Sequence, residues 1–471
     1  MQAIILNLHK DITLYNGETT TDRIIRLLKE NNISYTISNT LPSNITKPTI
    51  IIDNNLIFNN QLLHNYLEQE ETINLLELNK HNTYRITDAY NDNYINIIND
   101  NNKDILNKEL RIYDLYNQNI ITTEDYYNTL KDIITKDEPV FIISSKSMTH
   151  NITNKISNIT KNYIVFNDYQ PNPSYEDIKK GKELFIQSKA KTIISIGGGS
   201  TIDTAKCIKA FTNITDEQDI INKNYKYSPI KLIAIPTTSG TGSESTEVAI
   251  MYYNGEKLSV DHPSDLPNYA ILDHNLLKSV PDYQKKCTML DALCQSIEAI
   301  WSKNRTKLSK EYSKQSIKLI IDNYRSYLDN DDKSLKAIQL AANLSGRAIT
   351  LAKTTAPHTM CYRLTTKYNI AHGHAVGLNL ISNWQLINER KDNETKIMLE
   401  ELANIIGTDT IEESITTIDN LIKSLRLPIP NIKENEIDYL VEGVDLNRLS
   451  NHPIKLDKKD LYNIYLSIIN Q

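Results

Sequence analysis

Between residues 138 and 236, short apolar runs alternate with longer segments, and this alternation constrains the fold more than any other feature. The runs are "EPVFIISS", "NYIVFNDY", "KTIISIGGG" and "KLIAIP", and "YEDIKKGKELFIQSK" between the second and third has helical spacing. Strands alternating with helices in this way predict a parallel sheet with crossover helices on its faces. We place this α/β domain at residues 111–274.

The pattern changes after about residue 275, where strand signals end. Apolar residues then recur at three- and four-residue spacing in "ALCQSIEAIW", "QSIKLIIDNYRSYL" and "SLKAIQLAANLSGRAITLA". This periodicity predicts an all-helical domain over residues 275–471. A chain of 471 residues is longer than the chains that usually fold around one hydrophobic core, so more than one domain is expected.

Residues 1–110 contain strand-like runs, "QAIILNL" and "KPTIIIDNNLIF", and a helical run, "TTDRIIRLLKENN". The polar segment 91–108 is interpreted as a linker or irregular joint. The first strand and "PTIIIDNNLIF" resemble the opening of a nucleotidyltransferase, but the glycine-rich loop expected after that strand is missing. We therefore expect a small α/β accessory domain, with a degenerate nucleotidyltransferase-like domain as the alternative.

Composition argues against several partners. The net charge is −6 and no basic block stands out, which argues against nucleic acid or an anionic membrane surface. The chain has no apolar run long enough to span a membrane, and its N-terminus lacks the features of a signal peptide. Its four cysteines form no CxxC pair, so a reduced, cytoplasmic protein is expected.

The third apolar run enters three glycines in "IISIGGGSTIDTAK" (residues 193–206), and a helix follows. Glycine lets a phosphate approach the backbone, where free N–H groups and the helix dipole hold the anion. Ser200 is expected to cap the helix or bind the phosphate, and Asp203 to lie in the first helical turn. Gly197, Gly198, Gly199, Ser200 and Asp203 are therefore candidate cofactor-binding residues. The alternative is a glycine turn selected only for tight packing.

A second loop, "IPTTSGTGSE", follows the next apolar run. Its Thr237, Thr238, Ser239 and Thr241 are short hydroxyl donors suited to a nicotinamide ribose or a pyrophosphate. Ligands of open parallel sheets bind at the carboxyl ends of the strands. Two such loops in one sheet therefore favour a nucleotide site over an ordinary polar loop.

Three of the ten histidines fall between residues 356 and 374. His358 and His372 are candidate metal ligands, together with Asp291 and Gln295, which share one helix face in "MLDALCQSIEAIW". A carboxylate, an amide oxygen and two imidazoles form a workable set for a divalent cation. A catalytic ion of this kind polarises a carbonyl oxygen.

Five motifs stand in the order and at the spacing found in iron-containing (group III) alcohol dehydrogenases, relatives of dehydroquinate synthase. They are "PNPSYEDIKKG", "IGGGSTIDTAK", "IPTTSGTGSE", "DALCQSIEA" and "PHTMCYRLTTKYNIAHGH". Residues 111–471 therefore resemble this family. The resemblance implies a dehydroquinate synthase-like fold, with a Rossmann-like domain followed by an all-helical domain. It also implies an oxidoreductase that uses NAD(P)H and a divalent metal, Fe²⁺ or Zn²⁺, and a homodimer as one assembly state.

In that family the metal is held by an aspartate, a histidine four residues later and two further histidines. Carried over, the ligands are Asp291, Gln295, His358 and His372. Gln295 departs from the pattern, because the family usually has histidine there. An amide oxygen is a weaker ligand than imidazole for a first-row metal. The site therefore binds metal less tightly, takes a harder ion, leaves Gln295 outside the coordination sphere, or has lost its metal.

Two residues near the ligands are candidate catalytic residues. Tyr362 stands one helical turn after His358, where family members often have a histidine near the nicotinamide. It is expected to relay a proton, with simple packing as the alternative. His374 is expected either to relay a proton or to support a metal ligand.

The end of the first strand of the α/β domain bears on the choice of cofactor. Many NAD-preferring relatives carry an aspartate there that repels a 2′-phosphate. This chain has Ser144, Ser145 and Lys146 instead, so NADPH should be tolerated.

The segment "RAITLAKTTAPH" places cations and hydroxyls before His358, and these indicate an anionic substrate. The candidate substrate-binding residues are Lys353, Thr354, Thr355 and Arg363, and a solvated helix face is the alternative. The sequences of the segments "KTTAPHTMCYRLTT" and "HGHAVGL" resemble most those of the phosphonoacetaldehyde reductases of phosphonate biosynthesis. This implies reduction of phosphonoacetaldehyde to 2-hydroxyethylphosphonate.

Two other functions stay open at this point. One is another metal-dependent alcohol or polyol-phosphate dehydrogenase of the same fold. The other is a non-catalytic relative that has kept only the nucleotide cleft.

Overall fold

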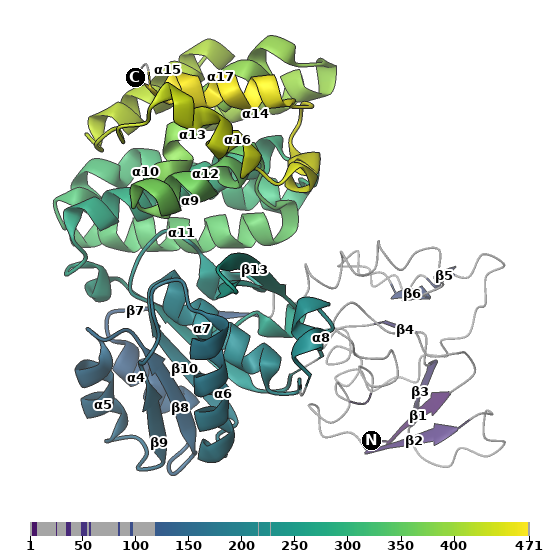
Figure 1. The fold of residues 1–471 in the computed structure, drawn as a ribbon. Coiled ribbons are helices and arrows are strands. Elements are labelled where there is room, and N and C mark those ends of the chain that lie inside the picture. The colour runs from purple at the N-terminus through teal and green to yellow at the C-terminus, as the bar shows by residue number, and fades with distance from the viewer. Residues whose placement is uncertain are drawn as a thin grey trace. The chain divides into compact units, whose positions relative to one another are not determined.

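The computed structural model describes residues 118–469, except residues 215 and 227, and, in the preceding part of the chain, residue 25 and six short strands. The chain separates into two compact units, Met1–Asn117 and Gln118–Gln471. Figure 1 shows the second unit as a sheet with flanking helices and a helical part above it.

In the first unit, strand β1 (Gln2–Leu6) pairs in parallel with both β2 (Ser34–Ser38) and β3 (Thr49–Asp53). These strands confirm the two apolar runs expected to be extended. The central position of β1 is typical of a parallel α/β arrangement.

A second small sheet in this unit contains the antiparallel strands β4 (Leu56–Ile57), β6 (Ile95–Ile97) and β5 (Thr83–Tyr84). Strand β6 lies within the polar segment 91–108, so the irregular interpretation is wrong for its three residues. The rest of that segment lies outside the described residues, as does the helical run expected at 20–32 apart from residue 25.

A six-stranded sheet forms the base of the second unit, and all of its neighbouring strands are parallel. Its spatial order is β7 (Asn119–Thr123), β14 (Tyr269–Asp273), β11 (Lys231–Pro236), β10 (Thr192–Gly197), β8 (Val140–Ser144) and β9 (Tyr163–Phe166). From β8 the chain first moves to β9 at the edge and then returns to β10 on the other side. The switch point therefore lies between β8 and β10, where open parallel sheets bind ligands.

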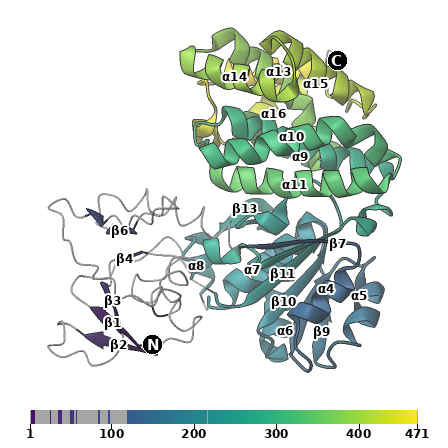
Figure 2. The same cartoon turned by 180° about the vertical axis from the view of Figure 1, so that it is seen from behind.

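Both faces of this sheet are buried, which explains the continuous apolar runs in its strands. On β8, Phe141 and Ile143 join one apolar cluster, whereas Val140 and Ile142 join the other. Helices lie on opposite sides of the strands, as Figures 1 and 2 show. They are α6 (Tyr175–Ser188) and α7 (Gly199–Phe211) on one side, and α4 (Tyr126–Ile133) and α5 (Thr149–Ile156) on the other. The short helix α8 (Glu217–Ile221) follows α7.

An antiparallel hairpin is inserted between β11 and β14. It consists of β12 (Val248–Tyr253) and β13 (Glu256–Asp261). Its turn residues, Asn254 and Gly255, have φ values of 50° and 79°, as a two-residue hairpin turn requires. The Tyr252 N–H donates to the Pro173 carbonyl at 2.8 Å, so the "PNPS" motif anchors this hairpin.

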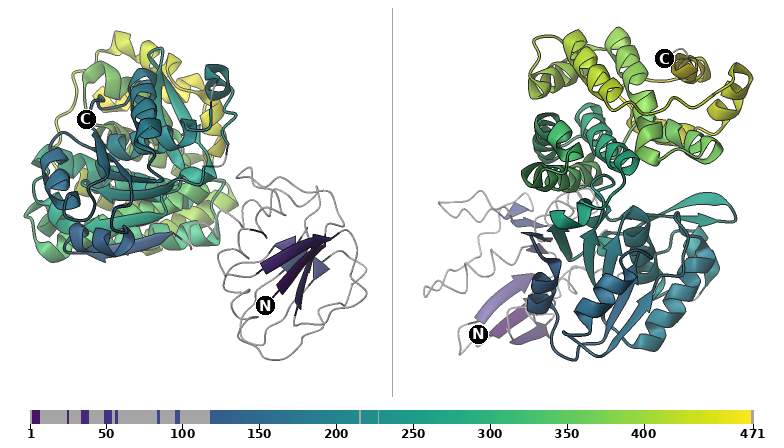
Figure 3. Two further views of the ribbon diagram at one scale, coloured as in Figure 1. Left: turned by 90° about the horizontal axis from the view of Figure 1, so that it is seen from below. Right: turned by 90° about the vertical axis from the view of Figure 1, so that its left-hand side faces the viewer.

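From residue 274 on, the described residues form helices and no strands, as the apolar periodicity predicts. The α-helices are α9 (Asp282–Trp301), α10 (Lys307–Leu328), α11 (Asp332–Ala352), α12 (Ala356–Tyr368), α13 (His372–Arg390), α14 (Asn393–Ile406), α15 (Ile411–Ser424), α16 (Ile437–Glu442) and α17 (Lys458–Ile469). Figure 3 shows this helical layer stacked against the α/β layer in a side view. None of the helices among the described residues is long and apolar enough to cross a membrane.

Helix α9 is the centre of the helical layer and packs against α10, α11, α13 and α14. It is buried on nearly all sides, including at its polar residues Asp291, Gln295, Ser296 and Glu298. Buried polar side chains require hydrogen-bond partners. The partners of these residues define the site described next.

Candidate active site

Asp291 on α9, His358 on α12 and His372 at the start of α13 form a compact cluster. One ligand atom of each lies within 4.8 Å of the others. Both imidazole Nε2 atoms approach the same Asp291 Oδ1, His358 at 3.2 Å and His372 at 3.7 Å. A carboxylate and two imidazoles fit Zn²⁺ or Fe²⁺, and three protein ligands leave a coordination position for a substrate.

Gly373 brings the start of α13 against α9. A Cβ on Gly373 would overlap the Cys287 carbonyl oxygen and lie 2.7 Å from Asp291 Cβ. Only glycine permits this approach, which carries the neighbouring His372 to Asp291. The turn expected between His358 and His372 is present, because α12 ends at Tyr368 and α13 begins at His372.

Gln295, the fourth expected ligand, bonds to two neighbouring elements. Its Oε1 accepts a hydrogen bond from Ser345 Oγ of α11 at 2.9 Å. Its Nε2 donates to the Thr241 carbonyl of the second glycine-containing loop at 3.4 Å. The amide therefore connects the helix that carries Asp291 to that loop.

Glu298, which the sequence analysis missed, is fully buried and supports His358. One oxygen, Oε1, accepts from His358 Nδ1, and Oε2 accepts from the Thr355 N–H at 2.7 Å and its hydroxyl at 2.9 Å. Because Glu298 holds a proton on Nδ1, Nε2 is the atom that can lose its proton and bind a metal beside Asp291. Glu298 lies seven residues after Asp291, on the same helix face, and this spacing could have identified it.

The charges around His358 favour a cation. Burial acts to lower the pKa of His358, but the Glu298 and Asp291 carboxylates outweigh it and raise that pKa to about 10. Burial lowers the pKa of His372 to about 4, so its imidazole is neutral near pH 7. Two buried carboxylates therefore hold one positive charge here, and a divalent ion can supply that charge in place of a proton.

The two candidate catalytic residues have different surroundings. The Tyr362 hydroxyl accepts a hydrogen bond from Arg448 Nη1 at 2.6 Å, and burial raises the pKa of Tyr362 to about 12. His374 lies 3.0 Å, through Nδ1, from the Tyr283 hydroxyl, and burial lowers its pKa to about 4. His374 is not a member of the three-residue cluster.

The two glycine-containing loops lie side by side at the carboxyl ends of β10 and β11. The Thr237 N–H donates to the Gly197 carbonyl at 3.0 Å. A Cβ on Gly199 would lie 2.9 Å from Thr241 Cγ2, and one on Gly198 would lie 3.4 Å from Thr238 Oγ1. Tight packing is therefore part of the reason for these glycines.

The loops also present groups that a ligand can reach. Gly198, Gly199 and Ser200 at the start of α7 are half-buried, as are Thr237, Thr238 and Thr241. The first N–H groups of an α-helix lack partners within the helix and point toward an anion at its N-terminus. Ser239, by contrast, is fully buried, so its hydroxyl does not face a ligand in this structure.

For the first loop, the capping alternative for Ser200 and the expected position of Asp203 are wrong. The N-cap of α7 is Gly198, so Ser200 is not the cap, and its hydroxyl accepts from the Asn172 N–H at 3.2 Å. Asp203 lies in the second turn, not the first, because the last glycine already belongs to the helix. Its carboxylate accepts from Ser243 Oγ at 2.6 Å and from the Ile250 N–H at 3.1 Å. Asp203 therefore ties α7 to the hairpin.

The end of β8 carries no carboxylate. The Ser144 hydroxyl is buried and lies 2.8 Å from Thr149 Oγ1, whereas Lys146 is exposed. The chain from Ser144 to Thr149 contains no acidic residue. Nothing in this turn repels a phosphate.

The expected substrate-binding residues before His358 serve internal contacts. Lys353 Nζ lies 3.5 Å from Asp261 and 3.7 Å from Glu247, which neutralise it. The Thr355 hydroxyl donates to Glu298 and accepts from Trp301 Nε1 at 2.9 Å, so it is fully used.

Thr354 bonds through its main chain, and Arg363 bonds to another helix. The Thr354 carbonyl accepts from Asn451 Nδ2 at 3.1 Å. Arg363 donates to the Tyr439 carbonyl of α16 and stacks 4.2 Å from the centre of that ring. Lys353, Thr355 and Arg363 therefore have protein partners for their polar groups, and Thr355 lies next to the cluster through Glu298.

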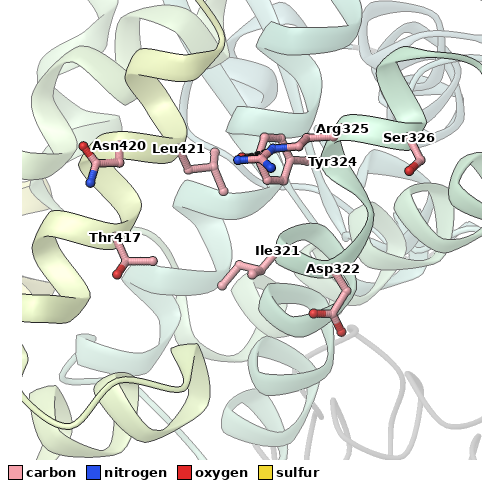
Figure 4. Close-up of a pocket in the computed structure, with 8 residues that line it drawn as sticks. All are labelled: Ile321, Asp322, Tyr324, Arg325, Ser326, Thr417, Asn420 and Leu421. Carbon is pink, nitrogen blue, oxygen red and sulfur yellow. Dashed lines mark hydrogen bonds between the residues drawn. The ribbon is translucent and has the colours of Figure 1, made fainter.

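A hollow of about 540 Å³ lies elsewhere, between α10 and α15 (Figure 4). Its lining includes Asp322, Tyr324, Arg325, Thr417 and Asn420. None of its lining residues belongs to the metal cluster or to either loop, so it is separate from the chemistry of the site.

Comparison with protein families agrees with this arrangement. Residues 117–274 match the family described as "Iron-containing alcohol dehydrogenase". Residues 286–469 match "Fe-containing alcohol dehydrogenase family, C-terminal". Together the two matches cover most of the chain.

Individual relatives are more distant. A phosphonoacetaldehyde reductase from Streptomyces viridochromogenes is 28% identical over 296 residues, covering 58% of this chain and 75% of that protein. An NAD-dependent methanol dehydrogenase from Bacillus methanolicus is 25% identical, covering 64% and 83%. An aldehyde-alcohol dehydrogenase from Streptococcus pneumoniae is 27% identical over 62% of this chain, which spans only 36% of that longer protein.

Solved structures share the fold. A sulfoacetaldehyde reductase from Bifidobacterium kashiwanohense, solved in complex with NAD⁺, has a TM-score of 0.69 at 23% identity, covering 75% of this chain and 97% of that one. An iron-containing alcohol dehydrogenase from Thermococcus thioreducens has a TM-score of 0.68, also at 23% identity, covering 75% and 98%. The chain belongs to the iron-containing alcohol dehydrogenase family, whose members are oxidoreductases that use NAD(P) and a divalent metal.

Proposed function

We propose that this chain reduces a small anionic aldehyde to an alcohol with NAD(P)H and a divalent metal. Phosphonoacetaldehyde, reduced to 2-hydroxyethylphosphonate, is the substrate we favour. The observation that carries the proposal is the convergence of Asp291, His358 and His372 from three helices. Gln295 links this cluster to the second loop, so metal and nucleotide chemistry share one neighbourhood.

The donor set fits a divalent ion, and the loops fit a dinucleotide. When bound, the ion would supply polarisation of the substrate carbonyl, and the reduced nicotinamide would supply the hydride. Asp291, His358 and His372 hold the ion, and Glu298 keeps His358 in the tautomer that binds. The start of α7 and the half-buried threonines Thr237, Thr238 and Thr241 bind and orient the cofactor.

Tyr362 is the better candidate for delivering the proton to the product oxygen. Its hydroxyl oxygen accepts a hydrogen bond from Arg448, which leaves the phenolic proton available for donation. A phenol with a pKa near 12 is still more acidic than an aliphatic alcohol. His374 is hydrogen-bonded to Tyr283 through Nδ1, so we assign it to support of the start of α13.

The preference for an anionic aldehyde is supported by relatives. One is named a phosphonoacetaldehyde reductase, and a structural neighbour is named a sulfoacetaldehyde reductase. Both names describe an aldehyde with a negatively charged group on the adjacent carbon. Dehydrogenases of neutral alcohols are also among the relatives, so the substrate must be tested directly.

The test is to follow NADPH and NADH oxidation by the purified protein with phosphonoacetaldehyde, sulfoacetaldehyde and acetaldehyde. Each assay is run with Fe²⁺, with Zn²⁺ and with a chelator. We expect metal-dependent turnover, fastest with phosphonoacetaldehyde. Preference for acetaldehyde would point to a neutral-alcohol dehydrogenase, and cofactor binding without turnover of any aldehyde would point to a non-catalytic relative.

We propose a cytoplasmic location and a homodimeric assembly. All four cysteines are free and buried, which supports a reducing compartment such as the cytoplasm. A homodimer is expected from the family resemblance.

A further inference from the structure

The second glycine-containing loop rests on two helices of the helical layer. A Cβ on Gly240 would lie 2.6 Å from Thr288 Cβ on α9. Gly242 has a φ of 59° and meets the backbone of α11, because a Cβ on Gly346 would lie 2.4 Å from the Gly242 carbonyl oxygen. Helices α9 and α11 therefore form the surface on which residues 240–242 lie, and the loop has no room to shift toward them.

Gln295 adds a polar contact between these two helices and the loop. Its Nε2 donates to the Thr241 carbonyl at 3.4 Å, and its Oε1 accepts from Ser345 Oγ at 2.9 Å. A carbonyl oxygen can only accept, so the NH₂ end of the amide faces Thr241 and the oxygen end faces Ser345. Gln295 and Ser345 are both buried, so water does not compete for these bonds.

Thr241 is thereby held from two sides. Its carbonyl faces Gln295, and its side chain lies against the start of α7, where a Cβ on Gly199 would be 2.9 Å from Thr241 Cγ2. Gly199 begins the helix whose first N–H groups point toward an anion. The position of the Thr241 backbone therefore affects both glycine-containing loops.

The metal cluster does not require the Gln295 amide. Asp291, His358 and His372 already supply a carboxylate and two imidazoles, which suffices for a catalytic ion with an open position. An amide oxygen is a weaker ligand than imidazole for a first-row metal. Coordination through Oε1 would also take that atom from the Ser345 hydroxyl.

We propose that Gln295 is a positioning residue of the cofactor site. It holds the Thr241 backbone, and with it the second loop, in the conformation that binds NAD(P)H, and it does not coordinate the metal. This inference rests on the proposed function, because it assigns a further residue to the cofactor site named there. It follows that a substitution at residue 295 separates cofactor binding from metal binding.

The test is Gln295→Met, which keeps a similar length and removes both polar atoms. NADPH binding to the intact, metal-free protein is measured by calorimetry, and Zn²⁺ binding by competition with a chromogenic chelator. We expect the Kd for NADPH to rise about five- to tenfold, as for one lost buried hydrogen bond, and the Zn²⁺ affinity to stay within a factor of two. Gln187→Met, at an exposed site on α6, is the matched control and should match the wild type in both assays.

A second variant tests whether the effect passes through the Thr241 carbonyl. Ser345→Ala keeps the Gln295 amide and removes the donor that orients it, so NADPH binding should weaken less than in Gln295→Met. The double variant should bind NADPH no more weakly than Gln295→Met alone, because both changes act on one contact. Losses that add in the double variant would contradict the shared contact and indicate two separate structural defects.

Two results of the binding assays overturn the inference. Wild-type affinity of Gln295→Met for NADPH would show that the loop does not depend on the amide. A loss of Zn²⁺ affinity of tenfold or more would make Gln295 a metal ligand.

Because neither assay needs turnover, the inference and the proposed function can fail separately. If the wild type reduces no aldehyde while Gln295→Met weakens NADPH binding alone, the positioning role stands and the proposed reaction fails. If the wild type reduces phosphonoacetaldehyde and Gln295→Met binds NADPH equally well, the reaction stands and the positioning role fails. A wild type that binds no NADPH would overturn both.

Discussion

Replacing Glu298 with glutamine should weaken metal binding without unfolding the protein, because it changes the tautomer of His358. In the wild type, three donors point at the two Glu298 oxygens: His358 Nδ1, the Thr355 N–H and the Thr355 hydroxyl. Glutamine has one acceptor oxygen. If that oxygen stays with the two Thr355 donors, the new NH₂ group faces His358 Nδ1, which must then accept.

In the neutral imidazole that binds metal, that change moves the single proton from Nδ1 to Nε2, the atom 3.2 Å from Asp291 Oδ1. Nε2 can then bind metal only after losing its proton or changing its tautomer. The opposite amide orientation leaves the buried Thr355 N–H unpaired, at a cost of about 1–3 kcal/mol. Loss of such a supporting carboxylate typically reduces metal affinity about 10- to 100-fold. The expected loss of binding free energy is about 1.4–2.8 kcal/mol.

The assay is competition for Zn²⁺ with a chromogenic chelator, together with thermal unfolding of the metal-free protein. Glu400→Gln, at an exposed site on α14, is the matched control and should bind like the wild type. The reasoning is refuted if Glu298→Gln keeps the wild-type Zn²⁺ affinity within a factor of two while its metal-free form unfolds at the wild-type temperature.

Three further predictions follow from the structure. Gly373→Ala should destabilise the metal-free protein by about 1–3 kcal/mol in urea unfolding and weaken Zn²⁺ binding, because its methyl group would overlap the Cys287 carbonyl; unchanged stability would contradict this packing. The catalytic efficiency with NADPH should be within tenfold of that with NADH, since no carboxylate follows β8; a strong NADH preference would contradict it. Burial lowers the pKa of His452 to about 3, from 6.5 in the unfolded chain. The contribution of the neutral imidazole to the free energy of unfolding should therefore be present above pH 6.5 and be lost as the pH falls toward 3. Between pH 6.5 and pH 5 the free energy of unfolding, measured with urea, should fall about 2 kcal/mol less in His452→Gln than in the wild type. If the free energies of unfolding of the two proteins changed equally with pH, the assignment to His452 would be contradicted.

The sequence predicts the features that depend on local pattern. The β/α alternation predicts the parallel sheet, and the helical periodicity after residue 275 predicts the all-helical layer. Three of the four expected metal ligands form one cluster, because Asp291, His358 and His372 stand at fixed places on α9, α12 and α13.

The features that were missed depend on tertiary contacts. Thr355 and Arg363 are close to His358 in sequence, but their side chains are committed to Glu298 and to Tyr439. Arg448 is far from every motif, and only the folded chain brings it to Tyr362.

Some local details were also beyond the sequence pattern. The cap of α7 is Gly198, two residues before Ser200, so Asp203 lies in the second turn and not in the first. The role of Gln295 depends on Ser345, a residue of another helix with which it shares no recognisable motif.

The most direct test of the central claim is a crystal structure of the protein loaded with Zn²⁺ or Fe²⁺, with anomalous diffraction recorded at the absorption edge of the metal. We predict one strong peak bounded by Asp291, His358 and His372, at roughly 2.0–2.2 Å from each ligand atom, with the Gln295 amide still bonded to Ser345. A metal-saturated crystal with no peak between these three side chains, or with its peak elsewhere in the chain, would contradict the account.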